Sequence, residues 1–135
     1  MAPQLDDKSL ISGQIAAADV VALAAAGVTM IVNNRPDHED SGQPLGSEIE
    51  AAAASAGIAY RHVPIIRGIG PGDVEAMREA MTAAGDGKML AFCRSGQRSA
   101  LACALAQREQ GVEREEVERR LKAAGFDPAP IQHLL

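Results

Sequence analysis

The sequence predicts a single three-layer α/β domain in which a mainly parallel sheet is flanked by helices on both faces. Short runs of β-branched and apolar residues alternate along the chain with alanine-rich stretches of helical length. This alternation is typical of parallel sheets whose strands are connected by helices. The 135 residues fit one domain, residues 1–135, and no repeat or low-complexity linker divides them.

The N-terminal half is expected to alternate between helix and strand. The stretch AAADVVALAAAG predicts a helix that ends at Gly27, and VTMIVN predicts a buried strand over 28–33. A polar loop follows, and then a second helix that runs to Gly57, with Ser47 and Glu50 at capping-box spacing near its start. The run IAYRHV predicts the next strand directly after this helix.

The C-terminal half continues the pattern. The stretch PIIRGIGPG is too rich in Pro and Gly for a regular element, and a helix is expected over 73–84. KMLAF predicts a strand, and a further helix is expected from Gln97 or Arg98 to Gln110. EREEVERRLKAAG predicts a helix that ends at Gly125, followed by a tail that can form one short helix.

Composition excludes several kinds of partner. The net charge is −5 and the aromatic fraction is 2%, so the chain is poorly suited to bind the phosphates or the bases of nucleic acid. No run approaches the roughly 18 to 20 apolar residues that span a bilayer, and the N-terminus lacks a basic start followed by a long apolar run. We therefore expect no nucleic-acid or membrane partner and a cytoplasmic location, where Cys93 and Cys103 would be thiols.

The segment FCRSGQRSA, residues 92–100, predicts an anion-binding loop around a nucleophilic sulfur. Cys93 follows a predicted strand, and ligands of parallel sheets bind beyond the carboxyl ends of the strands. Because few residues separate Cys93 from the next helix, backbone N–H groups and the helix dipole can face one anion and favour a thiolate. The alternative for Cys93 is a buried, apolar-like cysteine. Cys103 lies among Ala and Leu and is expected in the core rather than as a resolving thiol.

Several other side chains are candidates for roles at this site. Cys93 and Arg98 are the expected catalytic pair. The residues expected to bind substrate are Arg94, Ser95, Gly96, Gln97, Ser99, Arg67 and Arg35. Asp73 and Asp37 are candidates for a general acid, although aspartates in turns are commonly caps. No metal or cofactor is expected, because the contiguous polar side chains of residues 35–40 seldom converge on one ion.

Two families resemble this chain. The four residues between Cys93 and Arg98 look like the active-site loop of rhodanese sulfurtransferases, whereas cysteine-dependent phosphatases have five, a count that would place their arginine at Ser99. NNRPD, EIEAAAASAGIAYRHVPI and CRSGQRSA together resemble the phosphatase-like domain of beta-lactamase-hydrolase-like proteins over residues 10–110. This resemblance implies a dual-specificity-phosphatase-like fold. In fused relatives the domain precedes a persulfide dioxygenase, which implies such an enzyme as a partner in the same pathway.

Sulfur transfer is the function that the sequence favours. A shorter loop encloses less space above the sulfur, and moving the arginine by one residue changes the aim of its guanidinium. Dual-specificity phosphatases that resemble this chain carry an acidic Asp where this chain has Arg67. We therefore expect a sulfurtransferase that forms a Cys93 persulfide from a small anionic donor. The alternatives are a cysteine phosphatase that acts on small phosphoesters or phosphoproteins, and an inactive anion-binding module.

Overall fold

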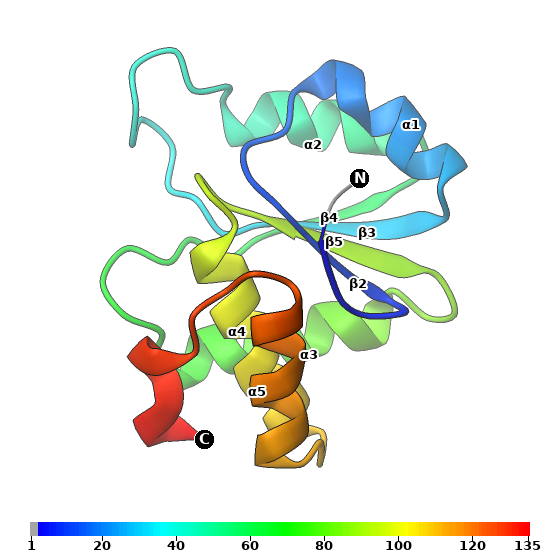
Figure 1. Cartoon of the computed structure of the whole chain (residues 1–135). Coiled ribbons are helices and arrows are strands. Elements are labelled where there is room, and N and C mark those ends of the chain that lie inside the picture. The colour runs from blue at the N-terminus through cyan, green and yellow to red at the C-terminus, as the bar shows by residue number, and fades with distance from the viewer. Residues whose placement is uncertain (1–2) are drawn as a thin grey trace.

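The computed structural model describes residues 3–135, which form a five-stranded sheet between two layers of helices (Figure 1). The strands are β1 (Gln4–Asp6), β2 (Ser9–Ser12), β3 (Val28–Asn33), β4 (Ala59–His62) and β5 (Lys88–Phe92). Their order across the sheet is β1-β2-β5-β3-β4, and only β1 runs antiparallel to its neighbour. The three-layer fold predicted from the sequence is confirmed, and β5 lies at the centre of the sheet.

Helices cover both faces of this sheet, as Figure 1 shows. The 3-10 turn η1 (Ala17–Asp19), α1 (Val20–Ala25) and α2 (Gly46–Ser55) lie on one face. On the other face lie α3 (Pro71–Ala83), α4 (Gln97–Glu109) and α5 (Arg114–Ala123), and the chain ends in the 3-10 helix η2 (Ala129–Leu134). Within the described residues, no helix combines the length and the apolar character needed to cross a membrane.

The central strand β5 contributes to both hydrophobic cores. Leu90 and Phe92 pack on the side of α1 and α2, whereas Met89 and Ala91 pack on the side of α3 and α4. Successive side chains of a strand point to opposite faces, so a strand that is buried on both faces is apolar at every position. This burial explains the uninterrupted run MLAF in β5. It also fixes the end of the strand, where the loop of residues 93–96, the Cys loop, begins.

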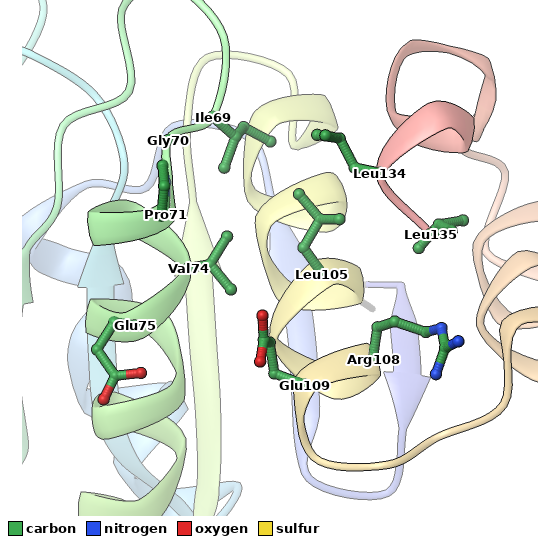
Figure 2. Close-up of a pocket in the computed structure, with 10 residues that line it drawn as sticks. All are labelled: Ile69, Gly70, Pro71, Val74, Glu75, Leu105, Arg108, Glu109, Leu134 and Leu135. Carbon is green, nitrogen blue, oxygen red and sulfur yellow. The ribbon is translucent and has the colours of Figure 1, made fainter.

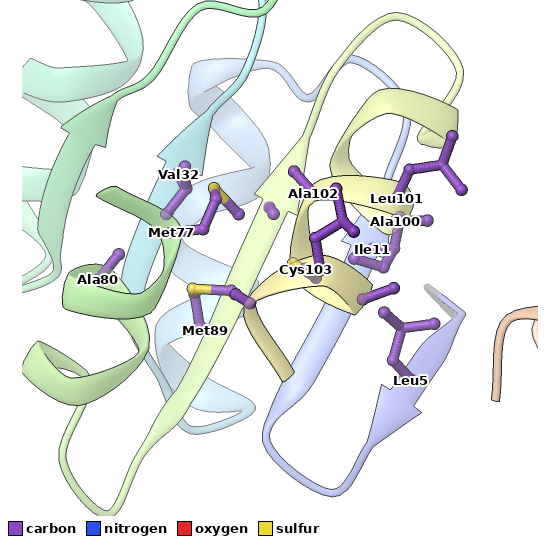
Figure 3. Packing of buried hydrophobic residues seen from close by; sticks show 14 of the residues in the cluster. Leu5, Ile11, Val32, Met77, Ala80, Met89, Ala100, Leu101, Ala102 and Cys103 are labelled. Carbon is purple, nitrogen blue, oxygen red and sulfur yellow. The ribbon is translucent and has the colours of Figure 1, made fainter. Parts of the chain in front are cut away.

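Small side chains on α4 let this helix pack closely against the sheet. Ala100, Ala102 and Cys103 have no exposed surface and belong to the same cluster as Met89 (Figure 3). Burial raises the pKa of the Cys103 thiol, and the charge of Asp6 adds to the shift. Cys103 is therefore a core residue, as the sequence predicted.

Two features of the fold differ from the sequence prediction. The hairpin of β1 and β2 was not predicted, and β2 extends the parallel sheet by pairing with β5. The predicted capping box of Ser47 and Glu50 is wrong, because α2 begins at Gly46 without a capping side chain at the preceding residue. The Gly46 N–H instead donates to the Asp37 carboxylate at 2.8 Å, a partner that lies nine residues earlier in the chain.

Candidate active site

Cys93 lies between the central strand β5 and the N-terminus of α4. It has no exposed surface, and its Sγ accepts a hydrogen bond from the backbone N–H of Gly96 at 3.1 Å. Gly96 is the N-cap residue of α4, a helix of 13 residues whose dipole places partial positive charge at this end. A backbone donor and a helix N-terminus both stabilise negative charge on sulfur, so the surroundings of Cys93 suit a thiolate nucleophile.

Gly96 is required at its position for two independent reasons. Its φ is 96°, in the left-handed region that other residues rarely adopt. A Cβ atom on Gly96 would also lie 3.2 Å from Cγ2 of Ile11 and 3.4 Å from the ring of Phe126. The turn that directs the N–H of Gly96 at the sulfur therefore needs glycine both for conformation and for space.

We expect Gly96→Ala to destabilise the fold more than Gly111→Ala. Gly111 has nearly the same φ, 97°, but a Cβ there would meet no atom within 4 Å. Both variants should lose about 1–2 kcal/mol of unfolding free energy from the left-handed conformation, and Gly96→Ala should lose more because Ile11 and Phe126 must move. Chemical denaturation of the two variants measures the difference, and equal losses would mean that the packing around Gly96 is looser than the structure indicates.

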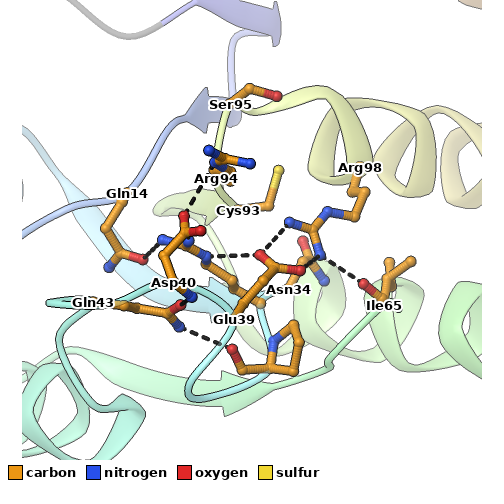
Figure 4. Close-up of polar contacts among 12 residues, drawn as sticks. Gln14, Asn34, Glu39, Asp40, Gln43, Ile65, Cys93, Arg94, Ser95 and Arg98 are labelled. Carbon is orange, nitrogen blue, oxygen red and sulfur yellow. Dashed lines mark hydrogen bonds and ion pairs between the residues drawn. The ribbon is translucent and has the colours of Figure 1, made fainter. Parts of the chain in front are cut away.

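Arg98 extends from the first turn of α4 toward a carboxylate. Its Nη1 and Nη2 donate to Oε2 and Oε1 of Glu39 at 2.9 and 2.7 Å, and Nη1 also donates to the carbonyl of Ile65 at 2.8 Å (Figure 4). The pKa of Arg98 is raised, chiefly by its hydrogen bond to Glu39 and also by the nearby Cys93 sulfur, while burial opposes the shift. The Arg98 guanidinium is thus paired with Glu39 and lies near the Cys93 side chain.

Arg35, which follows β3, is buried, with 3% of its side chain exposed. Its Nε donates to Glu39 at 2.8 Å, its Nη1 donates to Oε1 of Gln14 at 2.9 Å, and its Nη2 donates to Asp40. Asp40 also forms an ion pair with Arg94, whose side chain is 68% exposed. Arg35 therefore ties the segment that follows β3 to the segment that follows β2, whereas Arg94 faces solvent at the rim.

Ser99 is joined to the end of β3 rather than to the sulfur. Its Oγ donates to Oδ1 of Asn34 at 2.7 Å, and Nδ2 of Asn34 donates to the carbonyl of Val63 at 2.9 Å. Both Ser99 and Asn34 are fully buried. This chain of hydrogen bonds fixes the first turn of α4 against the ends of two strands.

The remaining residues predicted to bind substrate lie around the loop. Ser95 is exposed, and Oγ of Ser95 accepts the N–H of Gln97 at 3.4 Å. The side chain of Gln97 donates to the carbonyl of Asp127 at 3.2 Å, and Arg67 is exposed in the loop before α3. The substrate-binding roles of these residues stay predictions.

Both candidate acids accept backbone N–H groups at the starts of helices. Asp37 accepts the Gly46 N–H of α2 at 2.8 Å, and Asp73 accepts the Gly70 N–H before α3 at 2.9 Å. Both carboxylates are therefore engaged as backbone acceptors, the role that aspartates in turns commonly have. Among the described residues, no group of three His, Cys, Asp or Glu side chains is arranged to hold a metal ion.

Sequence reasoning did not select Glu39 for this site. Its position four residues after Arg35 hints at one ion pair, but its second partner, Arg98, is 59 residues away in the chain. Asn34 and Gln14 were missed for the same reason, because their partners Ser99 and Arg35 come from distant segments.

A groove of about 500 Å³ lies away from Cys93, between α3, α4 and the C-terminal residues (Figure 2). Its apolar lining comes from Ile69, Val74, Leu105, Leu134 and Leu135. Cys93 and Arg98 are not among the lining residues. The groove is therefore a surface feature separate from the loop around Cys93.

The phosphatase-like domain of beta-lactamase hydrolase-like proteins matches residues 4–110 of the chain. The chain belongs to this family. Beta-lactamase hydrolase-like proteins from Xylella fastidiosa and Agrobacterium fabrum are 37% and 33% identical to it over 91% and 93% of its length. The chain covers only 29% and 30% of these two relatives. The family resemblance predicted from the sequence is confirmed.

Solved structures agree with this family assignment. A candidate phosphatase from Neisseria meningitidis superposes with a TM-score of 0.83 and 32% identity, covering 98% of this chain and 94% of that one. A candidate phosphatase from Shewanella putrefaciens has a TM-score of 0.74 at 23% identity, covering 99% of this chain and 79% of that one. PTPMT1 has a TM-score of 0.75 at 14% identity, covering 99% and 91%. This phosphatase-like domain therefore has the fold of dual-specificity and tyrosine phosphatases.

Proposed function

We propose that this phosphatase-like domain is a cysteine-dependent phosphatase that hydrolyses phosphoesters with Cys93 as the nucleophile. The observation that carries this proposal is the position of Arg98, whose guanidinium lies near the Cys93 side chain (Figure 4) although only four residues separate the two in sequence. The sequence favoured sulfur transfer because a shifted arginine was expected to aim elsewhere. The proximity of Arg98 to Cys93 weakens that objection to phosphoryl transfer, and the likeness to candidate phosphatases supports the same function.

The reaction has two steps. The Cys93 thiolate attacks phosphorus, a sulfur–phosphorus bond forms, and the ester phosphorus–oxygen bond breaks as the alcohol oxygen leaves with the electron pair. Water then attacks the phosphocysteine, which releases inorganic phosphate and restores the thiolate. The Gly96 N–H and the N-terminus of α4 stabilise the sulfur when it leaves, and Arg98 binds two phosphoryl oxygens through its parallel N–H groups.

The capping roles of Asp37 and Asp73 limit the range of esters. A poor leaving group needs a proton from an acid as the bond breaks, and the carboxylates of both candidate acids already accept backbone N–H groups at helix N-termini. Esters whose leaving oxygen is stable as an anion need little such help. We therefore expect activated esters such as aryl phosphates to react faster than simple alkyl phosphates.

Sulfur transfer is the second candidate function. It is favoured by the four-residue spacing of Cys93 and Arg98 and by the engagement of Asp37 and Asp73 as caps, because sulfur transfer needs no acid. The Cys93 thiolate would attack the outer sulfur of thiosulfate, the sulfur–sulfur bond would break, and sulfite would leave. The resulting persulfide would pass to an acceptor thiol, which would make a persulfide dioxygenase a partner in the same pathway.

Two substrates distinguish the candidates. The purified protein is incubated with an aryl phosphate and, separately, with thiosulfate, while phosphate release and intact mass are measured. We expect continuous phosphate release and no sulfur adduct. A single added sulfur on Cys93 without phosphate release would replace the phosphatase proposal by sulfur transfer. If the protein carried out neither reaction but still bound phosphate, it would be an inactive anion-binding module.

A further inference from the structure

The Glu39 carboxylate occupies the face of Arg98 that would bind an anion. Its two oxygens accept hydrogen bonds from Nη1 and Nη2 of Arg98 at 2.9 and 2.7 Å, and one also accepts from Nε of Arg35 at 2.8 Å. A guanidinium binds a phosphoryl group through the same pair of parallel donors. The donors that the proposed phosphatase reaction requires are therefore already engaged by a carboxylate of the protein itself.

Hydrogen bonds within the loop hold Glu39 in this position. Before it, the Asp37 carboxylate accepts the Gly46 N–H at 2.8 Å, and after it, Nε2 of Gln43 donates to the Pro36 carbonyl at 2.9 Å. These two bonds fold the loop back on itself on either side of Glu39. The fixed backbone of this loop therefore helps to place the Glu39 carboxylate next to Arg98.

Cys93 is closed to solvent in this arrangement. Its exposed fraction is 0%, whereas the side chains of Arg98 and Glu39 are 24% and 27% exposed and so reach solvent. Figure 4 shows the Glu39 carboxylate and the Arg98 guanidinium facing each other beside the Cys93 side chain. The hydrogen bond from Arg98 lowers the pKa of Glu39, so the carboxyl group is charged at neutral pH. A substrate that pairs with Arg98 therefore has to displace a charged group.

We propose that Glu39 is a specificity-determining residue, an internal anion that competes with phosphoryl groups for Arg98 and Arg35. This inference rests on the proposed phosphatase function. Inorganic phosphate and other small dianions can displace Glu39 only through their own oxygens. Their apparent affinity is reduced because Arg98 is free of Glu39 for only a fraction of the time. An ester whose organic part also contacts the protein gains binding energy that offsets the displacement. Glu39 thus selects phosphoesters over inorganic phosphate.

The test compares Glu39→Gln with the wild-type protein. Glutamine keeps a hydrogen-bond acceptor but removes the charge, so the dissociation constant for inorganic phosphate, measured by titration calorimetry, should fall about tenfold. Iodoacetamide should also alkylate Cys93 faster. Glu118→Gln is the matched control, because it neutralises a glutamate paired with Arg114 on α5 at 3.1 Å and changes the net charge equally. It should leave phosphate binding and alkylation unchanged.

Glu39→Asp supplies a second variant. Aspartate keeps the negative charge, but its side chain is one methylene shorter, so the charge lies farther from Arg98. The affinity for phosphate should therefore rise less than in Glu39→Gln. If Glu39 only orients Arg98, both variants would bind phosphate more weakly than the wild-type protein. Either that result or an unchanged affinity would overturn the inference. Phosphate binding is measured without turnover, so a wild-type protein that binds phosphate but hydrolyses no ester would refute the phosphatase function alone.

Discussion

Cys93→Ser should abolish hydrolysis of an aryl phosphate, with a loss of about 10⁴-fold or more in kcat, because a serine hydroxyl at this position has no base to activate it. The fold should survive, since Cys93 and serine are close in size and the Gly96 N–H can donate to the new oxygen. Steady-state phosphate release measures the loss.

Cys103→Ala is the control for this substitution. Cys103 is the other cysteine of the chain, and burial in the α4 core raises the pKa of its thiol, so it is protonated and shielded. We expect nearly full activity in this variant. Equal losses in Cys93→Ser and Cys103→Ala would mean that cysteine substitution acts through stability, and an active Cys93→Ser protein would remove Cys93 from the mechanism.

Arg98→Ala should lower kcat/KM by about 10²–10³-fold, the loss expected when one donor to a developing negative charge is removed. Arg98→Lys should recover little of this loss, because an ammonium cannot offer two parallel N–H groups to a phosphoryl group. Initial rates with an aryl phosphate measure both effects.

Arg119→Ala is the control for Arg98→Ala. Arg119 is 66% exposed on α5 and pairs with Glu116, so this variant loses the same charge without touching the Cys93 loop. It should retain full activity. If Arg98→Ala were as active as Arg119→Ala, Arg98 would serve only to hold Glu39 and Ile65 in place, and another group would have to bind the phosphoryl oxygens.

The elements that the sequence predicted correctly are those with local signals. The apolar runs of β3 and β5 reflect burial on both faces of a parallel sheet, and Gly27 and Gly125 follow α1 and α5 with positive φ. The Cys loop could be recognised because Cys93, Gly96 and the start of α4 are adjacent in sequence. Its chemistry therefore depends on local geometry.

The missed features depend on contacts between distant segments. β1 and β2 have only three and four residues, too few for a clear periodicity, and β2 is stabilised by pairing with β5, about 80 residues later. The start of α2 is set by Asp37, which lies in the preceding loop. Glu39 contacts Arg98 across 59 residues. Such partners are determined by the folded chain, so no local sequence pattern reveals them.

The most direct test of the proposed chemistry is detection of the covalent intermediate. The wild-type protein is mixed with an excess of aryl phosphate, quenched with acid within the first turnover, and examined by intact mass and by peptide mapping. We predict one added phosphoryl group on Cys93, absent in Cys93→Ser and present in Cys103→Ala. Phosphate release in the wild-type protein without any phosphorylated Cys93, under conditions in which a phosphocysteine survives the quench, would contradict the account.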